Sequence, residues 1–133
     1  MERKIVYPDE DTVVAYNALA ITIFETKKAD QAKVLSRSKL SGAIRKCKDS
    51  KGDLYRKAAI LLKELIKAHA FASGNRRTAL IATIYFVKKN RGKINIPNNP
   101  NNAKVLQGIR EGYFTDEEIE GWIKNGKIKD FRR

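Results

Sequence analysis

The chain has 133 residues, which is enough for one domain with a hydrophobic core and too few for two ordinary domains. Its 28 lysine and arginine residues exceed its 15 acidic residues, and the formal net charge of +13 favours an anionic partner. The hydrophobic fraction of 42% excludes a chain that is disordered throughout, because disordered segments have too little apolar surface to offset the conformational entropy lost on folding.

The numbers of cysteine and histidine residues limit the kinds of metal site that the chain can form. Cys47 is the only cysteine, so the chain can form neither an internal disulfide nor a thiolate zinc cluster, and a single histidine argues against a zinc site built from protein ligands alone. Any metal would therefore be bound through oxygen.

The longest charge-free runs, 12–24 and 78–87, are too short to span a bilayer, and the first residues lead into no signal-like apolar region. We expect a soluble, cytoplasmic protein with no membrane partner.

Helical signals begin near the N-terminus. Pro8 and three acidic residues at 9–11 precede an apolar stretch, which is typical of a helix start because negative charge is favourable at the positive end of the helix dipole. We predict a helix over 9–24, followed by a short, weaker helical segment over 30–35.

The helical pattern fails over 36–53, where cations are interleaved with serine and glycine. We expect this stretch to be a loop or flap with at most a small hairpin. Two interpretations remain open: the flap closes over an anion, or it is a solvated loop whose basic residues keep the protein soluble. The cations are Arg37, Lys39, Arg45, Lys46, Lys48 and Lys51.

Two longer helices are predicted next. Over 54–69 apolar residues recur on one face, and His69 falls on that inward face, four residues after Leu65. After a loop over 70–74, a helix begins near Asn75 and has no charged residue over 78–87. Because a helix that is apolar all round is usually buried, we expect this helix to be the centre of the domain.

The C-terminal third carries shorter helical signals. Cations and a glycine over 88–92 end the preceding helix, and the proline- and asparagine-rich stretch 97–102 predicts a loop before a short helix. Thr115 and Glu118 form a capping box for a last helix, which stops near Gly126. With no internal repeat and no alternating strand pattern, the sequence predicts an all-α fold.

Two arginines stand where a helix normally prefers acids. Arg76 and Arg77 lie in the first turn of the helix near Asn75, and a cation there costs about 0.3–1 kcal/mol unless an anion lies opposite. Gly74 lets a ligand approach the backbone. Free N–H groups at the helix start and forked guanidinium donors together predict a phosphate site.

His69 approaches the same place from the preceding helix. An imidazole that titrates near neutrality beside bound phosphates indicates group transfer. The alternative interpretation is structural, with His69 capping the C-terminus of its helix and donating to a carbonyl.

Residues 69–80, HAFASGNRRTAL, resemble the signature of the Fic/Doc family, His-x-Phe-x-(Asp/Glu)-(Gly/Ala)-Asn-x-Arg-Thr, and look most like its Doc (death-on-curing) branch. The resemblance covers about 53–92, including the helices on both sides of the motif. It implies a compact helical bundle that forms one domain over 1–133. In that fold the flap over 36–53 would hold the segment to be modified.

The resemblance also implies a role for each motif residue. His69 would be the general base that takes a proton from a target hydroxyl, Phe71 would anchor the loop in the core, and Thr78 would complete the motif as a structural residue. The phosphates of ATP would be held by Gly74, Asn75, Arg76 and Arg77. These roles agree with the demands of phosphoryl transfer, which needs an aligned nucleophile and neutralised phosphate charge.

Two positions depart from the broader family pattern. Leu80 stands where adenylylating members carry a second arginine, and Doc-like proteins also lack it, which favours transfer of the terminal phosphoryl group over transfer of AMP. Ser73 stands where the family usually has an acid that helps hold Mg²⁺. A hydroxyl is a weaker ligand, but magnesium can rely on phosphates and water, so we keep ATP and Mg²⁺ as the expected cofactors. A loop serine is otherwise an ordinary turn residue.

The resemblance favours a Doc-like toxin, a kinase that phosphorylates a Ser or Thr hydroxyl on a protein of the translation machinery. The sequence has no Ser/Thr-x-x-x-Glu inhibitory pattern, since Ile119 follows Thr115 by four residues, so a separate antitoxin would restrain it. Two alternatives stay open. One is an adenylyltransferase on the same fold, and the other is a degenerate member that binds partners or nucleic acid, without sequence specificity, through its charge.

Overall fold

The computed structural model describes residues 4–24 and 31–132. These residues form six α-helices joined by loops, with one isolated bridge between Val34 and Phe71 and no strand within the described ranges, so the predicted all-α fold is confirmed. No helix in this part of the chain is long and apolar enough to cross a membrane. The helices are α1 (Glu10–Phe24), α2 (Arg37–Asp49), α3 (Leu54–Ala68), α4 (Asn75–Lys89), α5 (Asn102–Arg110) and α6 (Asp116–Asn125).

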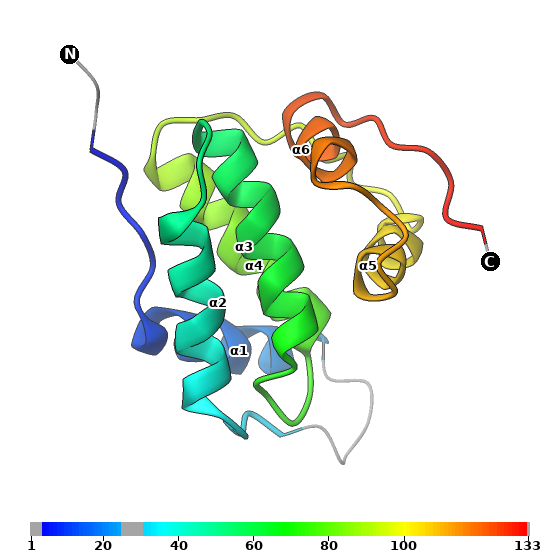
Figure 1. The fold of residues 1–133 in the computed structure, drawn as a ribbon. Helices are drawn as coiled ribbons and strands as arrows, with labels where there is room; N and C mark the ends of the chain where they lie inside the picture. The colour runs from blue at the N-terminus through cyan, green and yellow to red at the C-terminus, as the bar shows by residue number, and fades with distance from the viewer. Residues whose placement is uncertain (1–3, 25–30, 133) are drawn as a thin grey trace.

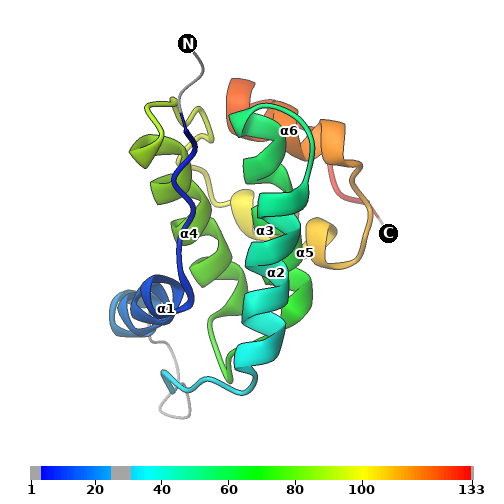
Figure 2. The same ribbon diagram turned by 60° about the vertical axis from the view of Figure 1, so that its left-hand side comes forward.

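The helices are arranged around α3. Figures 1 and 2 show α2, α3 and α4 running side by side, with α1 crossing near one end of them and with α5 and α6 on the other side of α3. Contacts between elements agree, because α3 packs against α2, α4, α5 and α6, whereas α1 packs mainly against α4. The helix expected at the centre of the domain was α4, and the structure places α3 there instead.

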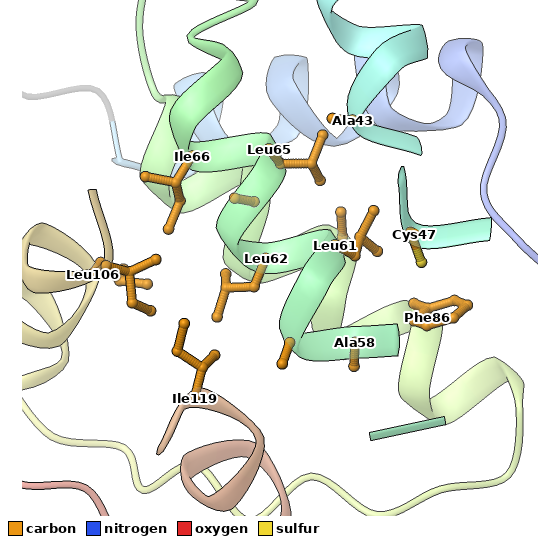
Figure 3. Packing of buried hydrophobic residues seen from close by; sticks show 14 of the residues in the cluster. Ala43, Cys47, Ala58, Leu61, Leu62, Leu65, Ile66, Phe86, Leu106 and Ile119 are labelled. Carbon is orange, nitrogen blue, oxygen red and sulfur yellow. The ribbon is translucent and has the colours of Figure 1, made fainter. Parts of the chain in front are cut away.

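Side-chain burial explains this correction. The apolar face of α3 includes Leu61, Leu62 and Ile66, which are at most 2% exposed, and Figure 3 shows them between residues of α2, α4, α5 and α6. By contrast, α4 buries one side only, and Tyr85 on it remains 49% exposed. The lack of charge over 78–87 reflects the cover of α4 by α1 along part of the outer side, where Tyr85 stacks on Tyr16 at a centroid distance of 5.2 Å.

The predicted flap over 36–53 is wrong, because most of it is helix α2. Ser36 caps this helix by accepting a hydrogen bond from the Lys39 N–H at 3.1 Å. Four residues at helical spacing are buried against α3: Leu40, Ala43, Ile44 and Cys47. A helix with so narrow an apolar stripe is stabilised by tertiary packing rather than by its own sequence. The cations, the serines and Gly42 therefore gave no helical signal from which α2 could be predicted.

The weak helical segment predicted over 30–35 is also wrong for the residues that the structure describes. Asp30 lies outside the described residues, and residues 31–35 form no helix. This stretch instead pairs with the loop after α3, since Leu35 N–H donates to the Ala70 carbonyl at 2.7 Å and Ala72 N–H donates to the Lys33 carbonyl at 2.9 Å. The other predicted helices are confirmed within a few residues, including the Thr115–Glu118 capping box of α6.

A buried lysine joins α2 to α3. Lys57 is 9% exposed, and its Nζ donates to the carbonyls of Cys47, Lys48 and Ser50 at 3.4, 3.1 and 2.6 Å. This places a positive charge at the C-terminus of α2, where the helix dipole favours a cation, and the Cys47 carbonyl also accepts from the N–H and the hydroxyl of Ser50. Cys47 returns a contact by donating its thiol to the Lys57 carbonyl at 3.3 Å, and burial raises the pKa of that thiol to about 12.

Replacing Lys57 by methionine tests this contact between α2 and α3. The Lys57→Met side chain fills similar space but removes the ammonium donor from the carbonyls of Lys48 and Ser50, so we expect a loss of about 1–3 kcal/mol in the free energy of unfolding. Urea denaturation followed by circular dichroism measures it. Lys39→Met, on the exposed face of α2, is the matched control and should change stability by less than about 0.5 kcal/mol. Equal effects in the two variants would contradict the proposed role of Lys57.

Candidate functional site

The loop between α3 and α4 reverses the chain within six residues. His69, the C-cap of α3, has φ 48° and ψ 49°, and Gly74, the N-cap of α4, has φ 74°, so both residues adopt the left-handed conformation. At Gly74 the lack of a side chain is needed twice, because a Cβ would be strained at this φ and would also lie 3.1 Å from Cδ1 of Ile21. The left-handed turn at His69 leaves that side chain exposed, whereas helical periodicity predicted an inward position.

The side chain of Asn75 holds the loop closed on itself. Its Oδ1 accepts a hydrogen bond from the Phe71 N–H at 3.0 Å, and its Nδ2 donates to the Phe71 carbonyl at 2.8 Å. The same Nδ2 lies 3.2 Å from Nδ1 of His69. Phe71 itself is 3% exposed and belongs to the core cluster. One amide therefore ties the start of α4 to both the anchored phenylalanine and the histidine.

Asn17 of α1 supports the loop from beneath. Its side chain is 1% exposed, and Nδ2 donates to the Ser73 carbonyl at 2.9 Å and to Oγ1 of Thr78 at 3.1 Å. Sequence reasoning missed this residue. The available signal was a single amide within the charge-free run 12–24, since a buried amide needs hydrogen-bond partners.

An open cleft of about 660 Å³ lies over the loop. The predicted phosphate-binding residues all line it, together with His69, Ser73 and Leu80. Phe71 and Thr78 do not line it, because both are buried beneath the loop. The full lining is Ile66, His69, Ala72, Ser73, Gly74, Asn75, Arg76, Arg77, Leu80, Ala103, Lys104, Leu106, Gln107 and Arg110.

The second wall of the cleft comes from α5, which sequence reasoning did not connect to the site. Lys104, Gln107 and Arg110 recur every three residues along this helix, and the residues between them pack into the core. Figure 3 shows Leu106 of α5 on the side of α3 that carries Ile66, and both residues also line the cleft. The spacing of three was a usable signal for a common face, but only tertiary packing shows that this face meets the motif.

The cleft carries several positive groups and no carboxylate among its lining residues. Arg76, Lys104 and Arg110 are exposed and make no ion pair within the described ranges. Elsewhere Arg56 and Lys63 contact the carboxylates of Glu120 and Asp116, each at 2.7 Å. Some basic side chains elsewhere are thus paired with carboxylates, whereas these three line the cleft without one, which favours an anionic ligand.

The start of α4 adds backbone donors to this positive field. Gly74 has no side chain to cap the helix, and the N–H groups of Asn75 and Arg76 find no acceptor among the residues that the structure describes. Such N–H groups and the helix dipole form an anion site when basic side chains and a cleft lie beside them, as they do here.

The Asn75 contact also sets the position of the proton on His69. Because Oδ1 of Asn75 accepts from Phe71, the group facing Nδ1 of His69 is the amide NH₂, which can only donate. A neutral imidazole in this contact accepts at Nδ1 and carries its proton on Nε2. No carbonyl in the described part of the chain accepts from the His69 ring, so the ring is not a carbonyl-bonded helix cap.

The donor set of the cleft does not fit a protein-bound Mg²⁺ ion. Magnesium is usually held through one or two carboxylates, and none lines the cleft, where Ser73 offers a single neutral hydroxyl. Among the described residues there is also no group of three or more histidine, cysteine, aspartate or glutamate side chains that could hold a metal. Cys47 is buried away from the cleft.

Comparison with known proteins places the chain in a family. The model of the Fic/DOC family matches residues 8–87, a range that runs from the residues before α1 to near the end of α4. Among curated proteins, no sequence matches the chain. Members of the family bind ATP, usually with a metal ion, and are generally transferases that act on protein targets and are commonly regulated by antitoxins. Because the match spans more than half of the chain and includes the complete loop between α3 and α4, this protein belongs to the Fic/Doc family.

Proposed function

We propose that this protein is a Doc-like toxin that transfers the terminal phosphoryl group of ATP to a Ser or Thr hydroxyl of a protein target. The observation that carries the proposal is the cleft in which His69 lies beside the uncapped start of α4 and beside Arg76, Lys104 and Arg110, which meet no carboxylate among the residues that the structure describes. A base next to a phosphate site supplies the two things that phosphoryl transfer requires, an aligned nucleophile and neutralised charge.

The phosphates of ATP bind at the start of α4 in this proposal. Gly74 lets an oxygen approach the backbone, the N–H groups of Asn75 and Arg76 donate to it, and the guanidinium groups of Arg76 and Arg77 add forked donors. The hydrogen bonds from Asn75 and Asn17 keep these donors in position before the ligand arrives. Donors that are already oriented stabilise charge in the transition state without a further reorganisation cost.

His69 receives the proton in the transfer step. The target oxygen forms a bond to the terminal phosphorus, the bond from that phosphorus to the bridging oxygen breaks, ADP leaves, and the hydroxyl proton passes to the imidazole. Accepting at Nε2 requires the ring proton to exchange through solvent from Nε2 to Nδ1, and because a protonated Nδ1 cannot accept from the Asn75 amide, that contact is released in the reactive state. At 3.2 Å it is the longest of the three contacts that Asn75 makes through its side chain, and so the least costly to lose.

Leu80 favours phosphoryl transfer over AMP transfer. It lines the cleft and presents an apolar side chain where adenylylating relatives, by the resemblance given above, have an arginine for the terminal phosphates. Transfer of AMP is the second candidate, and the observation in its favour is that Lys104 and Arg110 line the same cleft as Leu80. These two cations supply positive charge in place of the arginine that is absent at position 80.

A separate antitoxin completes the proposal. No Ser/Thr-x-x-x-Glu pattern occurs in the sequence, and the residue four positions after Thr115 is Ile119, whose side chain is fully buried in the core. A glutamate carried on a helix of this chain is therefore not the restraint that we propose. We propose instead that a protein partner which covers the cleft restrains the toxin.

Labelled ATP distinguishes the candidate reactions. The protein is incubated with a host lysate and magnesium, using ATP labelled at the terminal phosphate or, in parallel, at the inner phosphate. We expect terminal label on a protein band, and we expect His69→Ala to lower the transfer rate at least about 100-fold, because general bases contribute about 10²–10⁴. The affinity of His69→Ala for ATP should stay within about threefold of the parent.

Each other result has a definite meaning. Inner label on a protein band would identify AMP transfer, and unchanged turnover in His69→Ala would remove the assigned base. If neither label is transferred in a His69-dependent way, the chain is a binding protein rather than a kinase.

A pair of charge variants on one helix tests the phosphate site. Arg76→Ala removes a cation from the first turn of α4, and Lys88→Ala removes one from the last turn, so both change the net charge equally. We expect the dissociation constant for ATP to rise about tenfold in Arg76→Ala, because a charge-assisted contact is lost, and to change less than about twofold in Lys88→Ala. Isothermal titration calorimetry measures both. Equal weakening would mean that net charge, not the site, attracts the nucleotide.

A further inference from the structure

The cationic wall formed by α5 lies outside the segment that the family model matches. That match ends at residue 87, whereas Lys104, Gln107 and Arg110 belong to a helix that starts at residue 102. The family segment therefore does not account for these residues. Their position in the same cleft as His69 and Arg76 is a feature of this chain that the motif does not explain.

The packing of α5 on the core, rather than ion pairs at the surface, fixes the direction of its polar side. Val105, Leu106 and Ile109 of α5 are at most 6% exposed, so the helix cannot rotate to move its polar side away from the cleft without exposing them. Lys104 and Arg110 meet no carboxylate within the described residues that would hold them elsewhere. Their positive charge is therefore held at the cleft although it lies near other cations.

Charge neutralisation is the chemical role that this arrangement fits. A nucleoside triphosphate brings several negative charges, and phosphate sites commonly neutralise them with Mg²⁺ held by protein carboxylates. No carboxylate lines the cleft, and its basic side chains come from two elements, the start of α4 and the polar side of α5. Together they offer positive charge that could neutralise a phosphate chain without a metal ion.

We propose that Lys104 and Arg110 of α5 replace the divalent metal ion as the source of positive charge, so that this protein binds nucleoside triphosphates without metal. The inference rests on the proposed function, because it concerns the nucleotide of the same cleft. Gln107 lies between the two cations along the helix and offers an amide that can donate to a phosphate or ribose oxygen.

Calorimetric titration of the full chain with ATP tests the inference. The titration is done in excess EDTA and in excess Mg²⁺ at equal ionic strength, since salt alone weakens contacts between exposed charges. We expect the two dissociation constants to agree within about threefold. In the double variant Lys104→Ala/Arg110→Ala we expect ATP to bind at least about tenfold more weakly in EDTA, because two charge-assisted contacts are lost.

A matched double variant controls for net charge. Lys39→Ala/Arg45→Ala removes two exposed cations from α2, neither of which lines the cleft, and should bind ATP as the parent does. Urea denaturation of both double variants establishes that they fold. Loss of ATP binding by the parent in EDTA would overturn the inference, as would equal affinities for ATP in the two double variants.

These failures differ from failure of the proposed function. If ATP binds only with Mg²⁺, the kinase proposal stands and the role given to α5 is wrong. If ATP binds in neither buffer, the nucleotide assigned to the cleft is wrong, and the kinase proposal and this inference are overturned together.

Discussion

The site depends on two amide side chains that fix the loop between α3 and α4. Asn75 closes the loop on Phe71 and His69, and Asn17 ties the same loop to α1 through the Ser73 carbonyl and Thr78. Such a short turn with two left-handed residues has little regular structure to hold it, so these hydrogen bonds and the burial of Phe71 do so. The uncapped start of α4 then faces the cleft in a constant position relative to the histidine.

Core packing places α5, the second wall of the cleft, beside the loop between α3 and α4. The apolar face of α3 packs on α2 and α4 at one side and on α5 and α6 at the other, so this single helix positions both walls. The basic side chains that meet in the cleft repel one another, and the energy gained by burying Leu62, Ile66 and Leu106 holds them there. In the proposed function a bound polyphosphate would relieve that repulsion, which would link the stability of the fold to occupation of the site.

The differences between prediction and structure come from helices whose local signals were weak or ambiguous. In α2, four apolar residues among many cations were too few to indicate a helix, and their burial against α3 supplies the missing stabilisation. In α4, uniform apolarity indicated burial on every side, but α1 covers only part of the outer side and leaves Tyr85 half exposed. At His69 the helical period predicted an inward side chain, and a left-handed backbone turned it outward.

The sequence by itself determined the all-α class, the boundaries of the helices with clear caps or apolar stripes, and the motif loop that carries the residues proposed as base and phosphate ligands. These features depend on short-range patterns, because capping, helical spacing and the residue types of a loop are all local in the chain. Only the tertiary structure decided that α3 is central, that Asn17 supports the loop across 56 residues, and that Lys104 and Arg110 line the same cleft as His69. Those relations arise when distant apolar faces pack together, and no local pattern encodes which faces meet.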